Sequence, residues 1–264
     1  MDKTQIEPVQ LDAWQQLKQF TDARIALGRA GCSIPTRANL EFQYAHAQAK
    51  DAVHQQLDLQ QLSKQLKNYP HVHVHSQAVD KATYLKRPDL GRLLDQSSIQ
   101  QLQQVTRADA HDVLIVIGDG LSARAIEANA VALVEHLIEA CQTQGWSVAP
   151  LVIASHARVA LGDQVAEILN VPMLVMLIGE RPGLSSPDSM GIYYTWQAKI
   201  GSLDAQRNCI SNVRSAGLSV PMATQRLMAL MRESKRQGIS GVALKDQHRN
   251  EEVSIDTSSK KLLF

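Results

Sequence analysis

The sequence predicts an α/β protein in which a Rossmann-like parallel sheet domain is preceded by an N-terminal helical region. Three short apolar runs, at residues 113–117, 148–154 and 173–178, alternate with stretches whose apolar residues recur at helical spacing. Continuous apolar runs of this length are typical of strands that are buried on both faces of a parallel sheet. Right-handed crossovers produce this alternation of strand and helix. We therefore expect a helical region over residues 1–110 and a sheet domain over residues 111–264.

The N-terminal half has the apolar spacing of helices. We expect a short helix over residues 13–20 and a longer one, capped by Thr36, over residues 37–53. Asp58 resembles the first residue of a capping box, and the residues after it form one apolar helical face: Leu59, Leu62 and Leu66. A further helix is expected over residues 88–105, because a proline suits its first turn.

Local signals mark where the elements of the second half begin and end. Ser122 has the side chain of a helix N-cap, and Gly145 suits the position just after a helix. Pro150 cannot donate a ladder hydrogen bond, so the second strand either starts late or lies at an edge. The remaining elements that we expect are helices over residues 159–169 and 221–237 and a fourth strand over residues 192–196.

Composition excludes several classes of protein. The 27 Lys and Arg residues balance 26 Asp and Glu residues, and only 4% of residues are aromatic, so we expect no nucleic-acid partner. No apolar run approaches the roughly 18 residues of a membrane span, and the N-terminus lacks a signal-peptide core. The cysteines at 32, 141 and 209 are too sparse for a disulfide framework and are typical of the reducing cytoplasm. The polar segment 247–261 is typical of an arm or of disorder.

Three polar segments follow the predicted strands, where open parallel sheets bind ligands. Their glycine, serine, aspartate and arginine residues form tight turns and present polar groups, although ordinary solvated loops share this composition. The first segment lacks the Gly-x-Gly-x-x-Gly fingerprint, and Asp119 stands where a phosphate would approach, so a dinucleotide site fits poorly. The segments are GDGLSAR at 118–124, SHARVALGD at 155–163 and GERPGLSSPDS at 179–189.

Two other patterns each allow two interpretations. His71, His73 and His75 alternate with valines, so they either form the polar face of a strand or begin a metal site that no Cys or Glu cluster completes. Cys209 is either a nucleophile whose pKa is lowered by Arg207 or a thiol with a packing role. No self-sufficient set of catalytic residues is evident, which fits a subunit that holds part of a cofactor.

Six segments, in this order and at these spacings, resemble the small (light, or β) subunit of ethanolamine ammonia-lyase. The resemblance covers nearly the whole chain. The segments are ARIALGRAG from Ala23, YLKRPDLGR at 84–92, VLIVIGDGLSARA at 113–125, RVALGDQ at 158–164, LIGERPGLSSPDSMGIY at 177–193 and RNCISNV at 207–213.

The resemblance implies a carbon–nitrogen lyase that is active only with a large subunit. The family converts ethanolamine into acetaldehyde and ammonia by a radical mechanism that depends on adenosylcobalamin. The large subunit is a TIM barrel that binds ethanolamine, and six copies of each subunit form a dodecamer. The small subunit helps to bind the corrin ring, so residues 111–264 are expected to form the cobalamin-contacting domain. Little sequence precedes Ala23, so the location implied is the cytoplasm or a bacterial microcompartment.

Matching the family motifs to this sequence implies that Val159, Glu180 and Cys209 contact the cofactor. Glu180 is the expected side-chain acceptor for corrin amides, whereas Val159 and Cys209 are expected to contribute backbone or packing contacts. The chain is expected to supply neither a catalytic residue nor a metal ligand. Asp109 and His111 begin a cobalt-ligating motif, but Leu114 stands where that motif requires glycine. A non-catalytic scaffold and a stand-alone Rossmann-like oxidoreductase remain as alternative functions.

Overall fold

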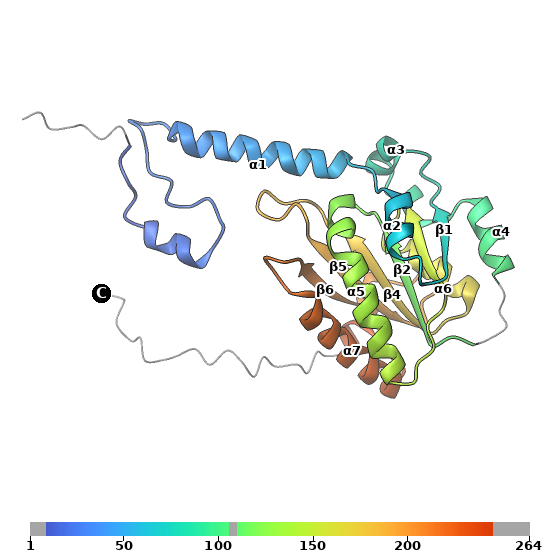
Figure 1. Ribbon diagram of the computed structural model, residues 1–264. Helices are drawn as coiled ribbons and strands as arrows, with labels where there is room; N and C mark the ends of the chain where they lie inside the picture. The colour runs from blue at the N-terminus through green and yellow to red at the C-terminus, as the bar shows by residue number, and fades with distance from the viewer. Residues whose placement is uncertain (1–8, 106–109, 245–264) are drawn as a thin grey trace, which may run out of the picture.

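A six-stranded mixed sheet forms the centre of the computed structural model, which describes residues 9–105 and 110–244 (Figure 1). The strand order is β1-β3-β2-β4-β5-β6. The first four strands in this order pair in parallel, whereas β5 and β6 pair antiparallel to their neighbours. The strands are β1 (His71–His75), β2 (Val113–Gly118), β3 (Leu151–Ser155), β4 (Met173–Gly179), β5 (Met190–Trp196) and β6 (Arg207–Val213).

The predicted α/β class is confirmed, and the three apolar runs form the parallel strands β2, β3 and β4. Every residue of β2 and β4 is buried, as expected for strands covered on both faces. The strand after Pro150 starts late, because its pairing with β1 begins at Leu151. The polar segment 247–261 lies outside the described residues.

The structure differs from the prediction at both edges of the sheet. β1 comes from residues 71–75, so one strand of the sheet precedes the boundary expected at residue 110, and the division into two domains stays a prediction. β6 was not predicted as a strand, because the sequence RNCISNV has no continuous apolar run and buries only three of its seven residues. The antiparallel direction of β5 follows from its connection to β4, because the ten residues 180–189 are too few for the crossover that a parallel pairing needs.

Helices cover both faces of the sheet (Figure 1). On one face, α5 (Ala123–Thr143) and α7 (Val220–Gln237) pack against each other, and α2 (Leu59–Gln65) joins the same core. On the other face, α4 (Gln96–Gln104) contacts β1 and α6 (Leu161–Leu169) contacts β4. The remaining elements are α1 (Thr36–His54), α3 (Lys81–Lys86) and 3-10 turns at Gln15–Phe20, Leu90–Arg92, Asp204–Gln206 and Gly241–Ala243.

Local capping signals account for most helix boundaries. The Ser122 hydroxyl accepts a hydrogen bond from the Ala125 N–H at 3.2 Å, and Gly145 follows α5 with a positive φ of 69°, as both were predicted to do. Asp58 caps α2 in the same way, but α1 begins at Thr36 itself and its cap residue is Pro35.

The single helix predicted over residues 88–105 is wrong. A 3-10 turn occupies residues 90–92, and the chain becomes extended at Leu93 before α4 begins. Asp95 starts α4 by accepting a hydrogen bond from the Ser98 N–H at 2.7 Å. The two elements are therefore separated by an N-cap signal that lies inside the predicted range.

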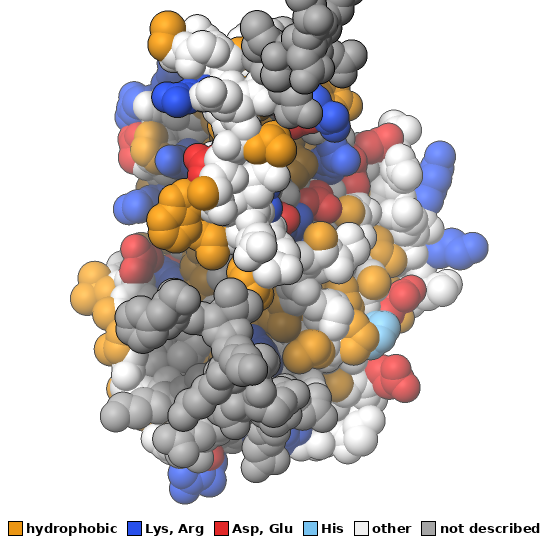
Figure 2. All heavy atoms as spheres, turned by 90° about the vertical axis from the view of Figure 1, so that its left-hand side faces the viewer, with side chains coloured by type: hydrophobic (Ala, Val, Ile, Leu, Met, Phe, Trp, Pro, Cys, Tyr) orange, Lys and Arg blue, Asp and Glu red, His pale blue; other side chains and the backbone are white. Residues whose placement is uncertain are grey.

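The N-terminal arm, residues 9–54, extends away from the sheet (Figure 1). The 19 residues of α1 give it a length of about 28 Å. Large hydrophobic side chains on the arm are exposed, and Trp14 and Phe20 are 67% and 77% exposed. Figure 2 views the molecule from the side on which the arm projects and shows hydrophobic side chains gathered there. Across the described residues, no helix has the combined length and hydrophobicity to cross a bilayer.

The cap of α5 provides a stability test. Ser122 is fully buried, and its hydroxyl also donates to the Pro187 carbonyl at 2.8 Å. We expect Ser122→Ala to lower the free energy of unfolding by about 1–2 kcal/mol, because it leaves both groups without a partner. Ser219 is a matched control, since it is the N-cap of α7 but its side chain makes no cap bond. Urea denaturation of both variants would contradict this account if Ser122→Ala cost no more than Ser219→Ala.

Candidate functional site

An open cavity of about 400 Å³ lies beside the N-terminus of α6. α5 and α7 pack against β5 and β6 on the face of the sheet that lies opposite α6. The cavity therefore lies over strand surface on the face that α6 covers. Two of the three residues expected to contact a cofactor, Val159 and Cys209, line it together. The lining comprises Pro88, Arg92, Arg158, Val159, Ala160, Tyr193, Ser202, Leu203, Asp204, Arg207 and Cys209.

Cys209 lies directly opposite Tyr193 in the antiparallel pairing of β5 and β6. Partial desolvation raises the pKa of the Cys209 thiol and the Glu180 carboxylate raises it further, whereas a hydrogen bond with Tyr193 acts in the opposite direction. The net shift favours the protonated thiol at neutral pH, which is a poor nucleophile. Activation of Cys209 by Arg207, one of the two interpretations of this residue, is therefore not supported.

Glu180 is the first residue after β4, at the carboxyl end of the strand as expected. Its Oε2 accepts hydrogen bonds from the Ser189 hydroxyl and from the Asn212 N–H at 3.3 Å. Its Oε1 packs over Gly191, where a Cβ atom would lie 3.0 Å from that oxygen. No described residue donates a hydrogen bond to Oε1, so this half-exposed carboxylate retains a free acceptor beside Tyr193.

The loop that carries Glu180, residues 180–189, is fastened to the elements around it. The Asn129 amide donates to the Asp188 carbonyl at 3.1 Å, and Arg214 donates to the Ser185 carbonyl at 3.1 Å. With the bond from Ser122 to Pro187, these contacts tie the loop to the start of α5 and to the end of β6. These contacts fix the position of the loop, and a role for it in ligand binding stays a prediction.

The glycine-containing turn after β2 has a structural role. Asp119 is only 3% exposed; its Oδ1 accepts from the Ala157 N–H at 3.0 Å, and its Oδ2 lies 3.6 Å from the Lys81 ammonium. Lys81 also donates to the Gly120 carbonyl at 3.0 Å. Burial lowers the pKa of Lys81, and the Asp119 carboxylate opposes that shift. This ion pair occupies the position where a dinucleotide phosphate would bind, so the structure does not support a nicotinamide site here.

The histidines of β1 each have a local partner. His73 hydrogen-bonds the Ser63 hydroxyl at 2.9 Å, and the His75 ring meets the edge of the His156 ring at 4.9 Å between centroids. Within residues 9–105 and 110–244, no group of three His, Cys, Asp or Glu side chains is placed to hold a metal ion. His111 lies before the first residue of β2, at the amino ends of the parallel strands, whereas Glu180 lies at their carboxyl ends.

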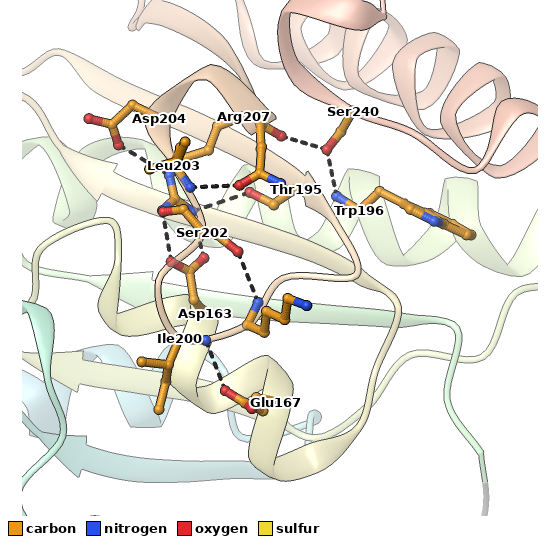
Figure 3. A network of polar contacts seen from close by, with 12 residues as sticks. Asp163, Glu167, Thr195, Trp196, Ile200, Ser202, Leu203, Asp204, Arg207 and Ser240 are labelled. Atoms are coloured by element: carbon orange, nitrogen blue, oxygen red, sulfur yellow. Dashed lines mark hydrogen bonds and ion pairs between the residues drawn. The ribbon is translucent and has the colours of Figure 1, made fainter.

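A buried ion pair holds Arg207, which lines the cavity, in place (Figure 3). The Arg207 guanidinium binds the Asp163 carboxylate with two contacts, Nη1 to Oδ1 at 2.5 Å and Nη2 to Oδ2 at 2.7 Å. Nη2 also donates to the Ser202 carbonyl at 2.8 Å, and Nε lies 3.3 Å from the exposed Asp204 carboxylate. These contacts join β6 to the first turn of α6 and to the loop that includes residues 202–204.

Sequence reasoning missed several residues of the site. Tyr193 could have been found from the alternation of side chains along β5. Its neighbours Ile192 and Tyr194 face the α5 side of the sheet, so Tyr193 faces the side that carries the cavity. Arg158 stands immediately before Val159 in a motif that was identified, and a basic residue between a strand and a helix is itself a signal for an anion site. The partnership of Arg207 with Asp163 spans 44 residues and leaves no local signal.

Comparison with known proteins gives consistent matches. The family model for the ethanolamine ammonia-lyase light chain (EutC) matches residues 11–245. A protein of Pseudomonas fluorescens (strain Pf0-1) named ethanolamine ammonia-lyase small subunit is 48% identical over 271 residues, covering 100% of this chain and 98% of the relative. Proteins with the same name from Pseudomonas aeruginosa (strain LESB58) and Pseudomonas syringae pv. tomato are 51% and 46% identical, covering 89% and 98% of this chain and 87% and 92% of the relatives.

The ion pair between Arg207 and Asp163 provides a second stability test. Asp163→Asn leaves the Arg207 charge buried without its main partner, so we expect the free energy of unfolding to fall by about 3–5 kcal/mol. Asp204→Asn removes the exposed partner of the same arginine and should cost less than about 1 kcal/mol. Urea denaturation distinguishes the two carboxylates, and equal losses for both variants would contradict the assignment of Asp163 as the dominant partner.

Proposed function

The chain belongs to the ethanolamine ammonia-lyase light-chain family, and we propose that its cavity contacts adenosylcobalamin where this small subunit meets the large subunit of the enzyme. The complete enzyme is a carbon–nitrogen lyase that converts ethanolamine into acetaldehyde and ammonia. One observation carries the proposal: Val159 and Cys209, from two separate motifs, line one open cavity, and Glu180, from a third motif, lies near enough to Cys209 and Tyr193 to raise the pKa of both.

The chemistry of the cavity fits a corrinoid. A corrin ring carries neutral amide side chains, which need both hydrogen-bond acceptors and donors. The free Oε1 of Glu180 supplies an acceptor, and Val159 supplies apolar surface in the cavity lining. When bound, the cofactor supplies a cobalt–carbon bond whose homolysis starts the radical reaction.

We assign binding and orientation of the cofactor, and no acid–base step, to the described residues of this site. The Cys209 thiol stays protonated, and Tyr193 has a raised pKa because it is desolvated beside Cys209 and Glu180. Neither group is suited to exchange protons with a substrate near neutral pH. We therefore assign the groups that contact ethanolamine to the large subunit, and we assign water exclusion on one side of the cofactor to this chain.

The N-terminal arm is the part of this chain that we assign to the large subunit. Nine of the exposed large hydrophobic side chains of the described residues lie on this arm, and such a concentration is typical of a surface that binds a protein partner. A dodecamer with six copies of each subunit, located in the cytoplasm or in a bacterial microcompartment, completes the proposal.

Two alternatives make different demands on the site. An oxidoreductase needs a phosphate loop after β2, where Asp119 instead binds Lys81. A scaffold subunit needs no contact with cofactor, so a loss of cofactor affinity in a Glu180 variant of an intact complex would exclude it.

Reconstitution tests the enzyme assignment. Acetaldehyde and ammonia should be released from ethanolamine and adenosylcobalamin only when this chain and the large subunit are mixed, because neither subunit holds the complete site. The assay is run with each subunit alone and with both together, all prepared in the dark. Activity of this chain alone, or a formed complex without activity, would contradict the assignment.

The role of Glu180 has its own test. Glu180→Ala removes one charge-assisted hydrogen bond, so we expect adenosylcobalamin to bind the assembled complex less tightly by about 1.5–3 kcal/mol. Glu233→Ala is a matched control, because Glu233 lies on α7 and bonds to Arg236 and Gln237. Equilibrium dialysis in the dark measures the affinities, and size-exclusion chromatography verifies assembly. Unchanged affinity in the Glu180 variant would favour the scaffold alternative.

A further inference from the structure

Arg158 is a cationic side chain of the cavity lining. It forms no ion pair with any residue in the described part of the chain, and its Nε is buried without a hydrogen-bond partner. Its Nη2 makes one long contact, 3.4 Å from the Tyr84 carbonyl oxygen. A buried N–H group without an acceptor is costly, and here it belongs to a cation that lines the cavity and has no carboxylate partner among the described residues.

Contacts with Gly91 and Tyr84 hold the Arg158 side chain in place. Its backbone N–H donates to the Gly91 carbonyl at 2.7 Å, and its guanidinium carbon lies 4.4 Å from the centroid of the Tyr84 ring. A Cβ atom at residue 91 would lie 2.9 Å from the Arg158 Cγ and 3.0 Å from the Tyr84 ring, so only glycine leaves space for both. The Tyr84 hydroxyl in turn donates to the Ala157 carbonyl at 3.1 Å. The side chain is thus preorganised by stacking.

The charges around the cavity favour an anion near Arg158. The carboxylates of Asp163 and Asp204 both bind Arg207, which leaves Arg158 and Arg92 as the arginines of the cavity that pair with no described carboxylate. Val159 and Ala160 separate Arg158 from α6, whose N-terminus carries a partial positive charge beside the same cavity. An arginine next to a helix N-terminus is a favourable place for a phosphate group.

We propose that Arg158 binds the phosphodiester of the cofactor's nucleotide loop. This inference rests on the proposed function, since it identifies which part of adenosylcobalamin reaches this wall of the cavity. The corrin amides are neutral, so the phosphodiester is the anionic group of the cofactor that a guanidinium would bind with two hydrogen bonds. Val159 belongs to the same wall, which places this anion site next to the corrin contact already assigned.

The test compares two corrinoids that differ at the phosphate. Adenosylcobinamide has the corrin ring and adenosyl group of adenosylcobalamin but lacks the nucleotide loop and its phosphodiester. Dissociation constants for both are measured by equilibrium dialysis in the dark, with the assembled complex of this chain and the large subunit. The variants are Arg158→Ala and Arg158→Lys, with Arg236→Ala as a matched control on the exposed end of α7.

We expect Arg158→Ala to weaken binding of adenosylcobalamin about 10- to 100-fold and binding of adenosylcobinamide less than about 2-fold. Arg158→Lys keeps the charge but loses the two-pronged geometry, so its loss for adenosylcobalamin should be intermediate. Arg236→Ala should change neither affinity. Size-exclusion chromatography of each variant verifies that the complex has formed.

Three results would overturn the inference. An equal loss for both corrinoids would mean that Arg158 acts through the packing of Tyr84 and Gly91, and no loss for either would mean that the phosphodiester lies elsewhere. In both cases the wild-type complex still binds adenosylcobalamin, so the proposed function survives. If the wild-type complex bound neither corrinoid, the proposed function would fail and this inference with it.

Discussion

The buried ion pair between Arg207 and Asp163 is the constraint on which the shape of the site depends. Burying two opposite charges costs desolvation free energy, which is offset only when the charged groups are in direct contact and their remaining polar atoms form hydrogen bonds. The Ser202 carbonyl, the Thr195 hydroxyl and the Asp204 carboxylate are further partners of the guanidinium. An edge strand, a helix N-terminus and a surface loop must therefore adopt their positions together, and the cavity is the space that remains between them (Figure 3).

The mixed direction of the sheet explains why the site extends over a strand face. In a fully parallel sheet, each further strand would bring a crossover helix to cover it. Here β5 and β6 add to the sheet by antiparallel pairing, and the next helix, α7, packs on the α5 side. Strand surface is thus left open beside α6, and it is continuous with the carboxyl end of β4, where Glu180 lies. An open strand surface of this kind leaves room for the broad ring of the proposed ligand.

Local sequence signals predicted the centre of the fold, and long-range contacts decided its edges. The apolar runs of β2, β3 and β4 and the caps at Asp58 and Ser122 act within a few residues, so they were visible in the sequence. β6 buries only every third residue, so it shows neither an apolar run nor an alternating pattern, and its pairing with β5 forms only in the folded chain. At the site, Val159, Glu180 and Cys209 were expected from motif resemblance. Their proximity, and the support of Arg158 by Gly91, depend on segments that are brought together only by folding.

The exposed arm has a consequence for how the protein is produced. Within the described chain, Trp14 and Phe20 remain largely bare, and α1 carries them away from the core that would otherwise bury them. Apolar surface of this kind favours self-association when no partner covers it. We therefore expect every copy synthesised in excess of the large subunit to be lost to aggregation or proteolysis. The quantity of functional chain in the cell would then depend on the supply of its partner.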